Sequence, residues 1–293
     1  MKKLALLFAI ITLTFTQGAY AQTKPKAPKK LRFGIYAPNT AFASNSARWS
    51  YIKGVANYVQ GLLKIPCSGR AFSSGGSFSG SLGGLDFALV DPIFMAMHRG
   101  SFTVLATSTY GGGSRAPWGL YAKGGGTFSS LKGKTLVLAR AGGAEVSVAE
   151  GLLSGEVKVR KYFGSVKIVP DLASAVQTVI NGGAHATFAP MKMASGLTLV
   201  FATSSMPNAS FALVNRKLPK DIVSKVRGAV QALGGGALGG MGGAAAGGVP
   251  MGRIKATFLS AYPPILRFQF RGFLKPFKGT YNKSPLISNY YKQ

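Results

Sequence analysis

The chain has 293 residues, of which 35 are Lys or Arg and only 7 are Asp or Glu, so its formal net charge is +28. A hydrophobic fraction of 47% is enough to pack a core, which excludes an intrinsically disordered protein. One Cys excludes a disulfide scaffold, and 2 His with 7 acids leave little from which to build a catalytic or metal centre. We therefore expect no enzyme activity, no cofactor and no metal.

The first 21 residues have the three parts of a secretory signal peptide. Lys2 and Lys3 are followed by an apolar stretch at 4–15 and by a cleavage site of the A-x-A type at 19–21. A retained membrane helix is the alternative, although the segment is short for one. We expect an exported, periplasmic monomer, because no later stretch is apolar over the length of a membrane span.

After a basic, Pro-spaced linker at 22–30, predicted strands and helices alternate. The first part contains a strand at 31–37, a helix at about 47–64 capped by Asn45 or Ser46, a Gly/Ser-rich passage at 68–84 that could contain a poor helix, a strand at 85–90, a short helix starting at Asp91-Pro92 and a strand at 102–107. After a loop at 110–117, we predict strands at 118–122, 135–139, 166–169, 186–189, 197–202 and 211–214, and helices at about 144–153, 172–181 and 220–233.

This alternation is typical of parallel α/β sheets and predicts two doubly wound α/β lobes joined by a hinge. We place the first lobe at 31–115, the second at 116–215 and a return segment to the first lobe at 216–293. The return segment includes a Gly-rich stretch at 234–248 and a basic, aromatic tail at 252–293. A ligand is expected between the lobes, at the carboxyl ends of the strands.

Four segments carry a resemblance to a known family: LRFGIYAPNT (31–40), GGLDFALVDPIFMAMHRG (83–100), FSSLKGKTLVLA (128–139) and DLASAVQTVINGGAHATFAP (171–190). With the export signal, they make the chain resemble periplasmic solute-binding proteins of ABC importers, type II fold, in the branch that binds phosphate, phosphite or phosphonate. The resemblance implies a small oxyanion as ligand and an ABC permease as partner. A sensor-linked binding protein is the alternative that the sequence does not separate from it.

The second lobe departs from that family at the turn before the helix at 144–153. The family has a Ser- and Thr-rich turn there, whose hydroxyls bind the oxyanion, whereas this chain has Arg140-Ala141-Gly142-Gly143 followed by Ala144-Glu145-Val146-Ser147. Free backbone N–H groups at a helix start bind anions, and Arg140 could add a bidentate contact. We predict ligand contacts from Arg140, Ala141, Gly142, Gly143 and Ser147; an ordinary strand–helix turn is the alternative.

The first lobe is predicted to contribute the residues that follow its strands. Asn39, Thr40, Asn45 and Ser46 lie between the first strand and the first helix, where N-capping is an equally simple role for the last two. Asp91 is more typical of a helix cap than of a ligand contact.

Three further candidates come from outside these turns. Tyr110 could stack on a ligand, and His185 could donate one hydrogen bond to it. Thr187 begins the segment in which the family often carries an Asp that pairs with an amino group of the ligand. Because that acid is absent here, an aminophosphonate is not the expected ligand.

The excess of basic residues supports an alternative function. A cationic, exported interaction protein could bind a polyanion or an anionic membrane surface through the tail at 267–286, where aromatic residues alternate with Lys and Arg. Nucleic acid is not an expected partner of an exported protein. Our main expectation is a solute-binding protein that captures a small anion.

Overall fold

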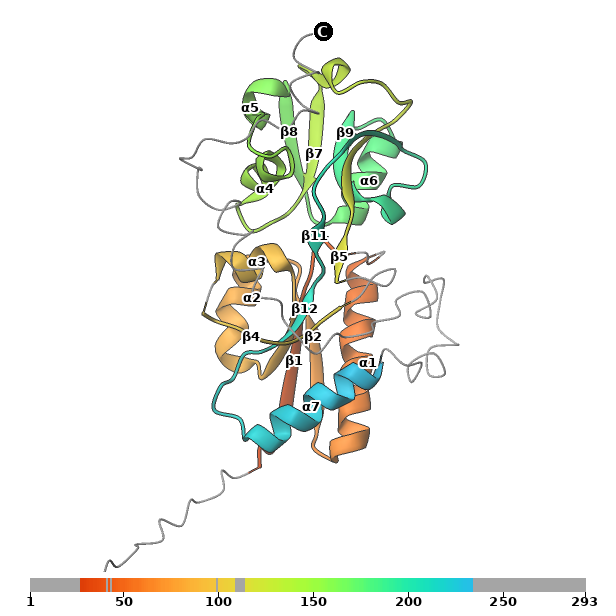
Figure 1. Cartoon of the computed structure of the whole chain (residues 1–293). Helices are drawn as coiled ribbons and strands as arrows, with labels where there is room; N and C mark the ends of the chain where they lie inside the picture. The colour runs from red at the N-terminus through yellow and green to blue at the C-terminus, as the bar shows by residue number, and fades with distance from the viewer. Residues whose placement is uncertain (1–26, 41, 43, 99, 109–113, 234–293) are drawn as a thin grey trace, which may run out of the picture.

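The computed structural model describes residues 27–40, 42, 44–98, 100–108 and 114–233, which form two α/β lobes stacked end to end (Figure 1). The predicted signal peptide, Tyr110, the Gly-rich stretch and the tail lie outside the described residues. Within the described ranges, no helix combines the length and the apolar character that a membrane span requires.

The first lobe contains a five-stranded sheet in the order β2-β1-β3-β12-β4. Its strands are β1 (Leu31–Tyr36), β2 (Cys67–Ala71), β3 (Phe87–Val90), β4 (Thr103–Thr107) and β12 (Ser210–Leu213). β2 and β3 pair with β1 in parallel, whereas β12 is antiparallel to both β3 and β4. The predicted second-lobe boundary at 215 is therefore wrong: the hydrogen bonds of β12 go to strands of the first lobe.

Helices cover both faces of this sheet, as the doubly wound prediction requires. α1 (Asn45–Leu63) and α7 (Lys220–Ala232) pack on the face where Phe33, Phe87 and Phe211 stack on one another. α2 (Gly75–Ser81) and α3 (Pro92–Met97) cover the other face through a cluster of aromatic residues that includes Phe78 and Phe94. Because both faces are buried at the centre of the sheet, β3 is apolar and buried in every position.

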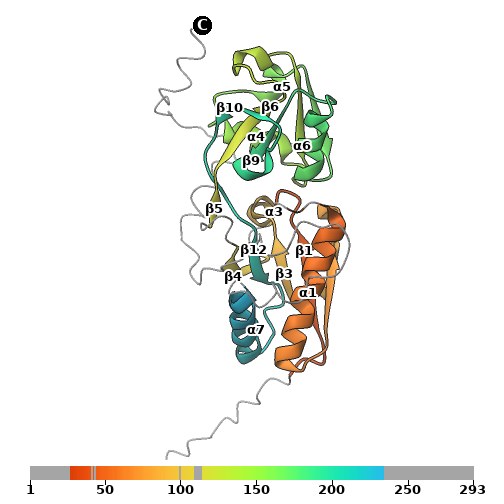
Figure 2. The same cartoon turned by 90° about the vertical axis from the view of Figure 1, so that its right-hand side faces the viewer.

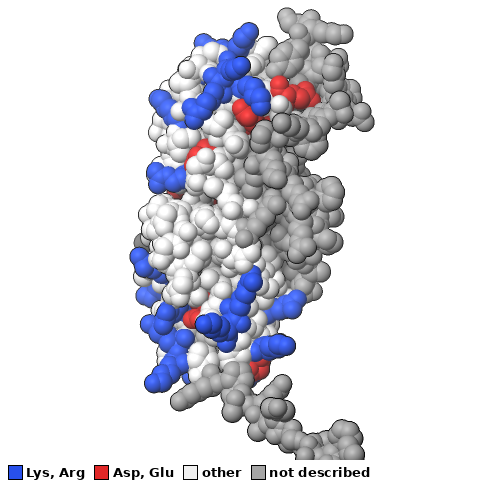
Figure 3. Space-filling model, turned by 90° about the vertical axis from the view of Figure 1, so that its left-hand side faces the viewer, with Lys and Arg blue, Asp and Glu red and all other residues white. Residues whose placement is uncertain are grey.

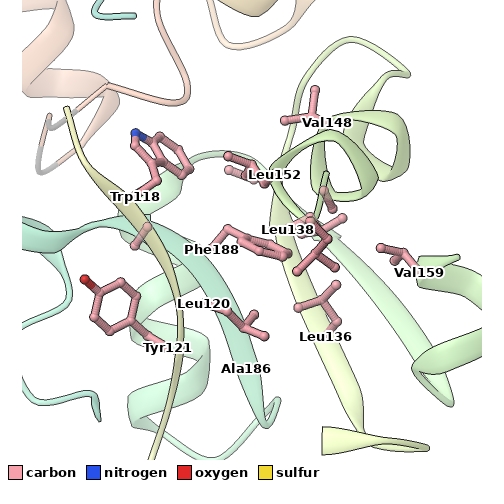
Figure 4. Packing of buried hydrophobic residues seen from close by; sticks show 14 of the residues in the cluster. Trp118, Leu120, Tyr121, Leu136, Leu138, Val148, Leu152, Val159, Ala186 and Phe188 are labelled. Atoms are coloured by element: carbon pink, nitrogen blue, oxygen red, sulfur yellow. The ribbon is translucent and has the colours of Figure 1, made fainter. Parts of the chain in front are cut away.

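The second lobe repeats the plan with a sheet in the order β10-β6-β9-β7-β8. Its strands are β6 (Trp118–Ala122), β7 (Thr135–Ala139), β8 (Ser165–Val169), β9 (Ala186–Pro190) and β10 (Thr198–Ala202). α4 (Glu145–Leu152) and α5 (Val159–Tyr162) pack on the core of this lobe, which Figure 4 shows around Leu138 and Phe188. α6 (Leu172–Ile180) packs on the other face through Val137 and Val179.

Two short strands connect the lobes. β5 (Arg115–Ala116) takes the chain into the second lobe and β11 (Met206–Pro207) brings it back, and the two pair antiparallel (Figures 1 and 2). The carboxyl ends of β1 and β3 face the carboxyl end of β7 across the junction between the lobes. The predicted fold class, two doubly wound lobes with a hinge, is confirmed.

Three local details differ from the sequence expectation. α1 is capped by Ser44, whose Oγ accepts a hydrogen bond from Ala47 N at 3.1 Å, and not by Asn45 or Ser46. The Gly/Ser-rich passage holds a strand, β2, as well as the helix α2. The helix α5 was not predicted.

Candidate functional site

The first wall of the site is the turn that follows β1. Asn39 N donates a hydrogen bond to Asp91 Oδ2 at 3.0 Å, and Asp91 Oδ1 accepts another from Ile93 N at 2.9 Å at the start of α3. Asp91 thus caps α3, as predicted, and at the same time fixes the turn that carries Asn39 and Thr40. Burial raises the pKa of Asp91 to about 6, and the hydrogen bonds from Ile93 and Asn39 act against that increase.

The opposite wall is the turn between β7 and α4. Gly142 and Gly143 have positive φ angles of 68° and 96°, which a residue with a side chain would adopt only with strain. The N–H groups of Ala141 and Gly143 converge on one acceptor, Glu145 Oε1, at 2.8 and 3.0 Å. Burial alone would raise the pKa of Glu145, but these hydrogen bonds and the charge of Arg140 outweigh it and lower that pKa.

Direct contacts hold the two walls together. Asn39 Nδ2 donates to the backbone oxygen of Arg140 at 3.2 Å, and Leu172 N donates to Pro38 O at 3.0 Å. The Cα of Gly142 lies next to Met97 and Phe94 of α3, so that a Cβ there would be 3.7 Å from the Met97 methyl carbon. The structure therefore represents the lobes in a closed arrangement.

An ion pair adds to this closure at the amino-terminal ends of α1 and α6. Arg48 Nη2 lies 3.0 Å from Asp171 Oδ2, and both side chains are buried. Asp171 also caps α6 by accepting from Ser174 N and Oγ. Burial would raise the pKa of Asp171, but the bonds from Ser174 and the pairing with Arg48 lower it overall. Arg48 Nη1 is buried without a hydrogen-bond partner among the described residues.

A cavity lies at the junction of the lobes and the hinge. Its volume is about 50 Å³, counted as the space that the centre of a water molecule can occupy, and this is more than a single water molecule needs. Its walls come from both lobes and both hinge strands: Asn39, Thr40, Phe42, Tyr51, Leu89, Pro92, Ser108, Ala116, Trp118, Pro190, Met206, Pro207, Asn208 and Ala209. We call it the central cavity.

A smaller cavity of about 20 Å³ shares Asn39 and Trp118 with the central cavity and reaches Ala141 and Glu145. Its other walls are core residues of the second lobe, including Leu138, Leu152 and Phe188. Figure 4 shows the Trp118 ring at the edge of this core, beside Leu152 and on the side of the first lobe. Trp118, which is 7% exposed, therefore separates the core from the space between the lobes.

The walls of the two cavities carry few charged side chains. None of the described lining residues of the two cavities is Lys or Arg, and Glu145 is their one charged side chain. Hydrogen-bonding groups come from Asn39, Thr40, Ser108 and Asn208, amid mainly apolar surface. A pocket with an apolar wall and a few placed polar groups is typical of a small-molecule site.

The structure brings some of the predicted residues together. Asn39 and Thr40 line the central cavity, Ala141 lines the smaller one, and Arg140 accepts the hydrogen bond from Asn39 through its backbone oxygen. Gly142 packs against α3, and Gly143 contacts Glu145. Asp91 lies behind Asn39 and lines neither cavity.

Other predicted residues lie elsewhere. Asn45 lines an outer groove with residues of α6, Ser46 is exposed on α1, and Ser147 is exposed on α4. His185 is at the wrong end of the sheet: its Nδ1 accepts from Thr135 N at the start of β7, roughly 15 Å from the strand's carboxyl end. Thr187 is fully buried in mid-strand, paired with Val137 and Tyr121. Neither residue lines the central cavity.

Sequence reasoning missed Arg48, Glu145 and Asn208 as part of the site, and Trp118, which lines both cavities, was not among the predicted site residues. An acid two positions after Gly143 was the available signal for Glu145, because carboxylates satisfy free N–H groups at helix starts. Arg48 carried no such signal, since its partner Asp171 is 123 positions away in the chain.

Comparison with solved structures supports the fold. A binding-protein component of a phosphonate ABC transporter from Pseudomonas aeruginosa superposes with a TM-score of 0.64 at 13% identity, covering 91% of this chain and 94% of its own. A Xanthomonas citri protein bound to ATP gives 0.61 at 14% identity, with 85% and 98% covered. The protein PhnD1 from Prochlorococcus marinus in complex with methylphosphonate gives 0.58 at 12% identity, with 70% and 85% covered. No family model and no curated protein matches the sequence.

These neighbours define the class of fold. The chain has the two-lobed, type II fold of the solute-binding proteins of ABC transporters. At 12–14% identity the likeness extends to the fold and not to a ligand.

Proposed function

We propose that the protein is an exported solute-binding protein, which holds a small molecule in the central cavity and presents it to an ABC permease. The observation that carries this proposal is the cavity itself, because both lobes and both hinge strands contribute to its wall. A ligand there would contact every part that moves when the lobes separate, so ligand binding and closure would be coupled.

The walls favour a particular kind of ligand. Trp118, Phe42 and Tyr51 offer apolar surface, and the amide groups of Asn39 and Asn208 can orient polar groups. We expect a small ligand with an apolar body and two or three hydrogen-bonding groups. The oxyanion expected from the sequence has less support, because no basic side chain is among the described residues of the wall.

A thermal-shift panel tests this function. Phosphate, methylphosphonate, sulfonates, carboxylates, small amines and amides are added to the wild type and to Trp118→Ala. A ligand at about 100 times its Kd stabilises the folded state by about 2.7 kcal/mol, or roughly 5–10 °C in a protein of this size. We expect such a shift from at least one compound class in the wild type and its loss in Trp118→Ala.

Trp49→Ala is the matched control. Trp49 is 46% exposed on α1 and its ring contacts Lys53, away from the residues of the cavity wall. A shift that disappears equally in both Trp variants, or a panel without any stabilising compound, would argue against the proposal.

The cationic interaction protein remains a second candidate because of the net charge of +28. Figure 3 shows basic side chains scattered over both lobes, while the middle of that face is largely uncharged. A scattered distribution favours a general surface property over one binding patch. We therefore rank this function below solute binding.

A further inference from the structure

A carboxylate of the protein itself, that of Glu145, occupies the start of α4. Two backbone N–H groups of the turn, those of Ala141 and Gly143, point at Glu145 Oε1, at 2.8 and 3.0 Å. Backbone amides that converge at a helix start form the kind of concave site that binds phosphate and carboxylate groups. Here a side chain from the first turn of the same helix fills that position.

Glu145 also lies at the space between the lobes. Glu145 lines the smaller cavity together with Asn39 of the first lobe and Trp118 beside the hinge. The lowered pKa of Glu145 keeps the carboxylate ionised at neutral pH. A ligand oxyanion that approached the turn would have to displace this group or lie against a like charge.

We propose that Glu145 is a specificity-determining residue, which excludes phosphate- and phosphonate-like oxyanions from this turn. The ligand group that meets it is uncharged or positively charged. The inference rests on the proposed solute-binding function, and it reverses the ligand charge that the basic composition suggests. It also predicts that the amides of the turn become an anion site once the carboxylate is removed.

The alternative is that Glu145 acts only as a helix cap. If the carboxylate only satisfied the two N–H groups, its removal would destabilise the fold without creating affinity for an anion. Binding of a probe anion, and not stability alone, therefore separates the two roles.

Isothermal titration of the full mature chain with inorganic phosphate and with methylphosphonate provides the test. Glu145→Ala is expected to bind at least one of these probes at least tenfold more tightly than the wild type. Glu145→Gln keeps the size and one acceptor oxygen but removes the charge, so a smaller gain, of a few-fold, is expected. It also keeps the test informative if the Ala variant folds poorly, which circular dichroism would reveal.

Glu150→Ala is the matched control, because Glu150 is the other acid in α4 and contacts Val159 N and Lys158 instead of the cavities. Its affinity for both probes should equal that of the wild type. The inference is overturned if the wild type binds both probes as tightly as Glu145→Ala, or if neither Glu145 variant gains affinity. Either result leaves the Trp118-dependent ligand shift untouched, so failure here is distinct from failure of the solute-binding proposal.

Discussion

Asp91 combines full burial with a role in holding the site. It is 1% exposed, and both of its oxygens accept backbone hydrogen bonds, one from its own helix and one from the turn of Asn39. The folded state therefore holds an acid whose pKa is raised to about 6 from an ordinary value of 3.8. Because the folded state binds the proton more tightly, Asp91 favours folding more as pH falls from above 6 toward 4.

This shift predicts how Asp91→Asn changes the pH dependence of stability. Between pH 7.5 and pH 5, the wild type should gain roughly 1 kcal/mol of unfolding free energy relative to the variant, which does not titrate at this site. Urea unfolding at the two pH values measures the difference, and all other titrating groups cancel in the comparison. Parallel pH profiles of the two proteins would contradict the raised pKa.

At the scale of elements, the backbone of α1 lies close to that of β2 at Gly69. A Cβ on Gly69 would lie 2.7 Å from Ile52 O and 2.9 Å from Lys53 N, both backbone atoms of the helix. Any larger residue at position 69 would therefore push α1 away from the sheet, and with it the buried Arg48 and Tyr51.

Two Gly→Ala substitutions should have opposite effects on stability. Gly69→Ala is expected to destabilise the protein by about 1–3 kcal/mol, because the helix must shift. Gly54→Ala, in the middle of α1 with nothing within 4 Å of the new Cβ, should stabilise it by about 0.5–1 kcal/mol. Chemical denaturation of both variants gives the two values. Equal effects would mean that α1 is not in contact with Gly69 as described.

The contact between Gly69 and α1 also shows why some strands could be predicted from the sequence and β2 could not. Strands such as β3 and β7 are runs of apolar residues between turn signals, so their pattern alone identifies them. β2 reads Cys-Ser-Gly-Arg-Ala and lies at the sheet edge under a helix, where a small residue matters more than an apolar one. The pattern of hydrophobic residues therefore missed it.

Those features of the candidate site that follow from the order of strands and helices along the chain could be predicted. Those that depend on which strands and side chains pair with one another could not. Asn39 and Arg140 follow strands whose carboxyl ends meet, so their approach follows from the fold class. The return of β12 to the first sheet, the pairing of Arg48 with Asp171 and the positions of His185 and Thr187 away from the cleft depend on which strands are neighbours. The local pattern of apolar residues and the order of the elements do not reveal those neighbours.

For the whole molecule, the main question is what keeps the lobes closed. The buried Arg48–Asp171 pair, the Asn39–Arg140 bond and the Leu172–Pro38 bond all cross between the lobes. A buried pair is costly to break on one side, since the remaining charge loses its partner without regaining water.

Asp171→Asn should therefore shift the protein toward an open arrangement. The amide oxygen can still cap α6, so we expect a cost at the lower end of the roughly 3–5 kcal/mol reported for broken buried pairs, which opening would relieve by hydrating Arg48. Small-angle X-ray scattering should show a larger radius of gyration than in the wild type. Glu150→Gln, which weakens an exposed pair with Lys158, should leave the radius unchanged; an unchanged radius for Asp171→Asn as well would argue against the ion pair as a closing contact.

The position of β12 also sets an order of events for a chain that emerges from its amino end. β12 lies between β3 and β4, and its neighbour Ala209 bonds to Ser108, which is 101 positions earlier. The second lobe is continuous from β6 to β10, so it contains all its own strands as soon as it has been synthesised. The first lobe begins earlier but has to wait for a strand that arrives after the other lobe, and closing that long loop carries an entropic cost. The half of the protein that is made first is therefore the half that is completed last.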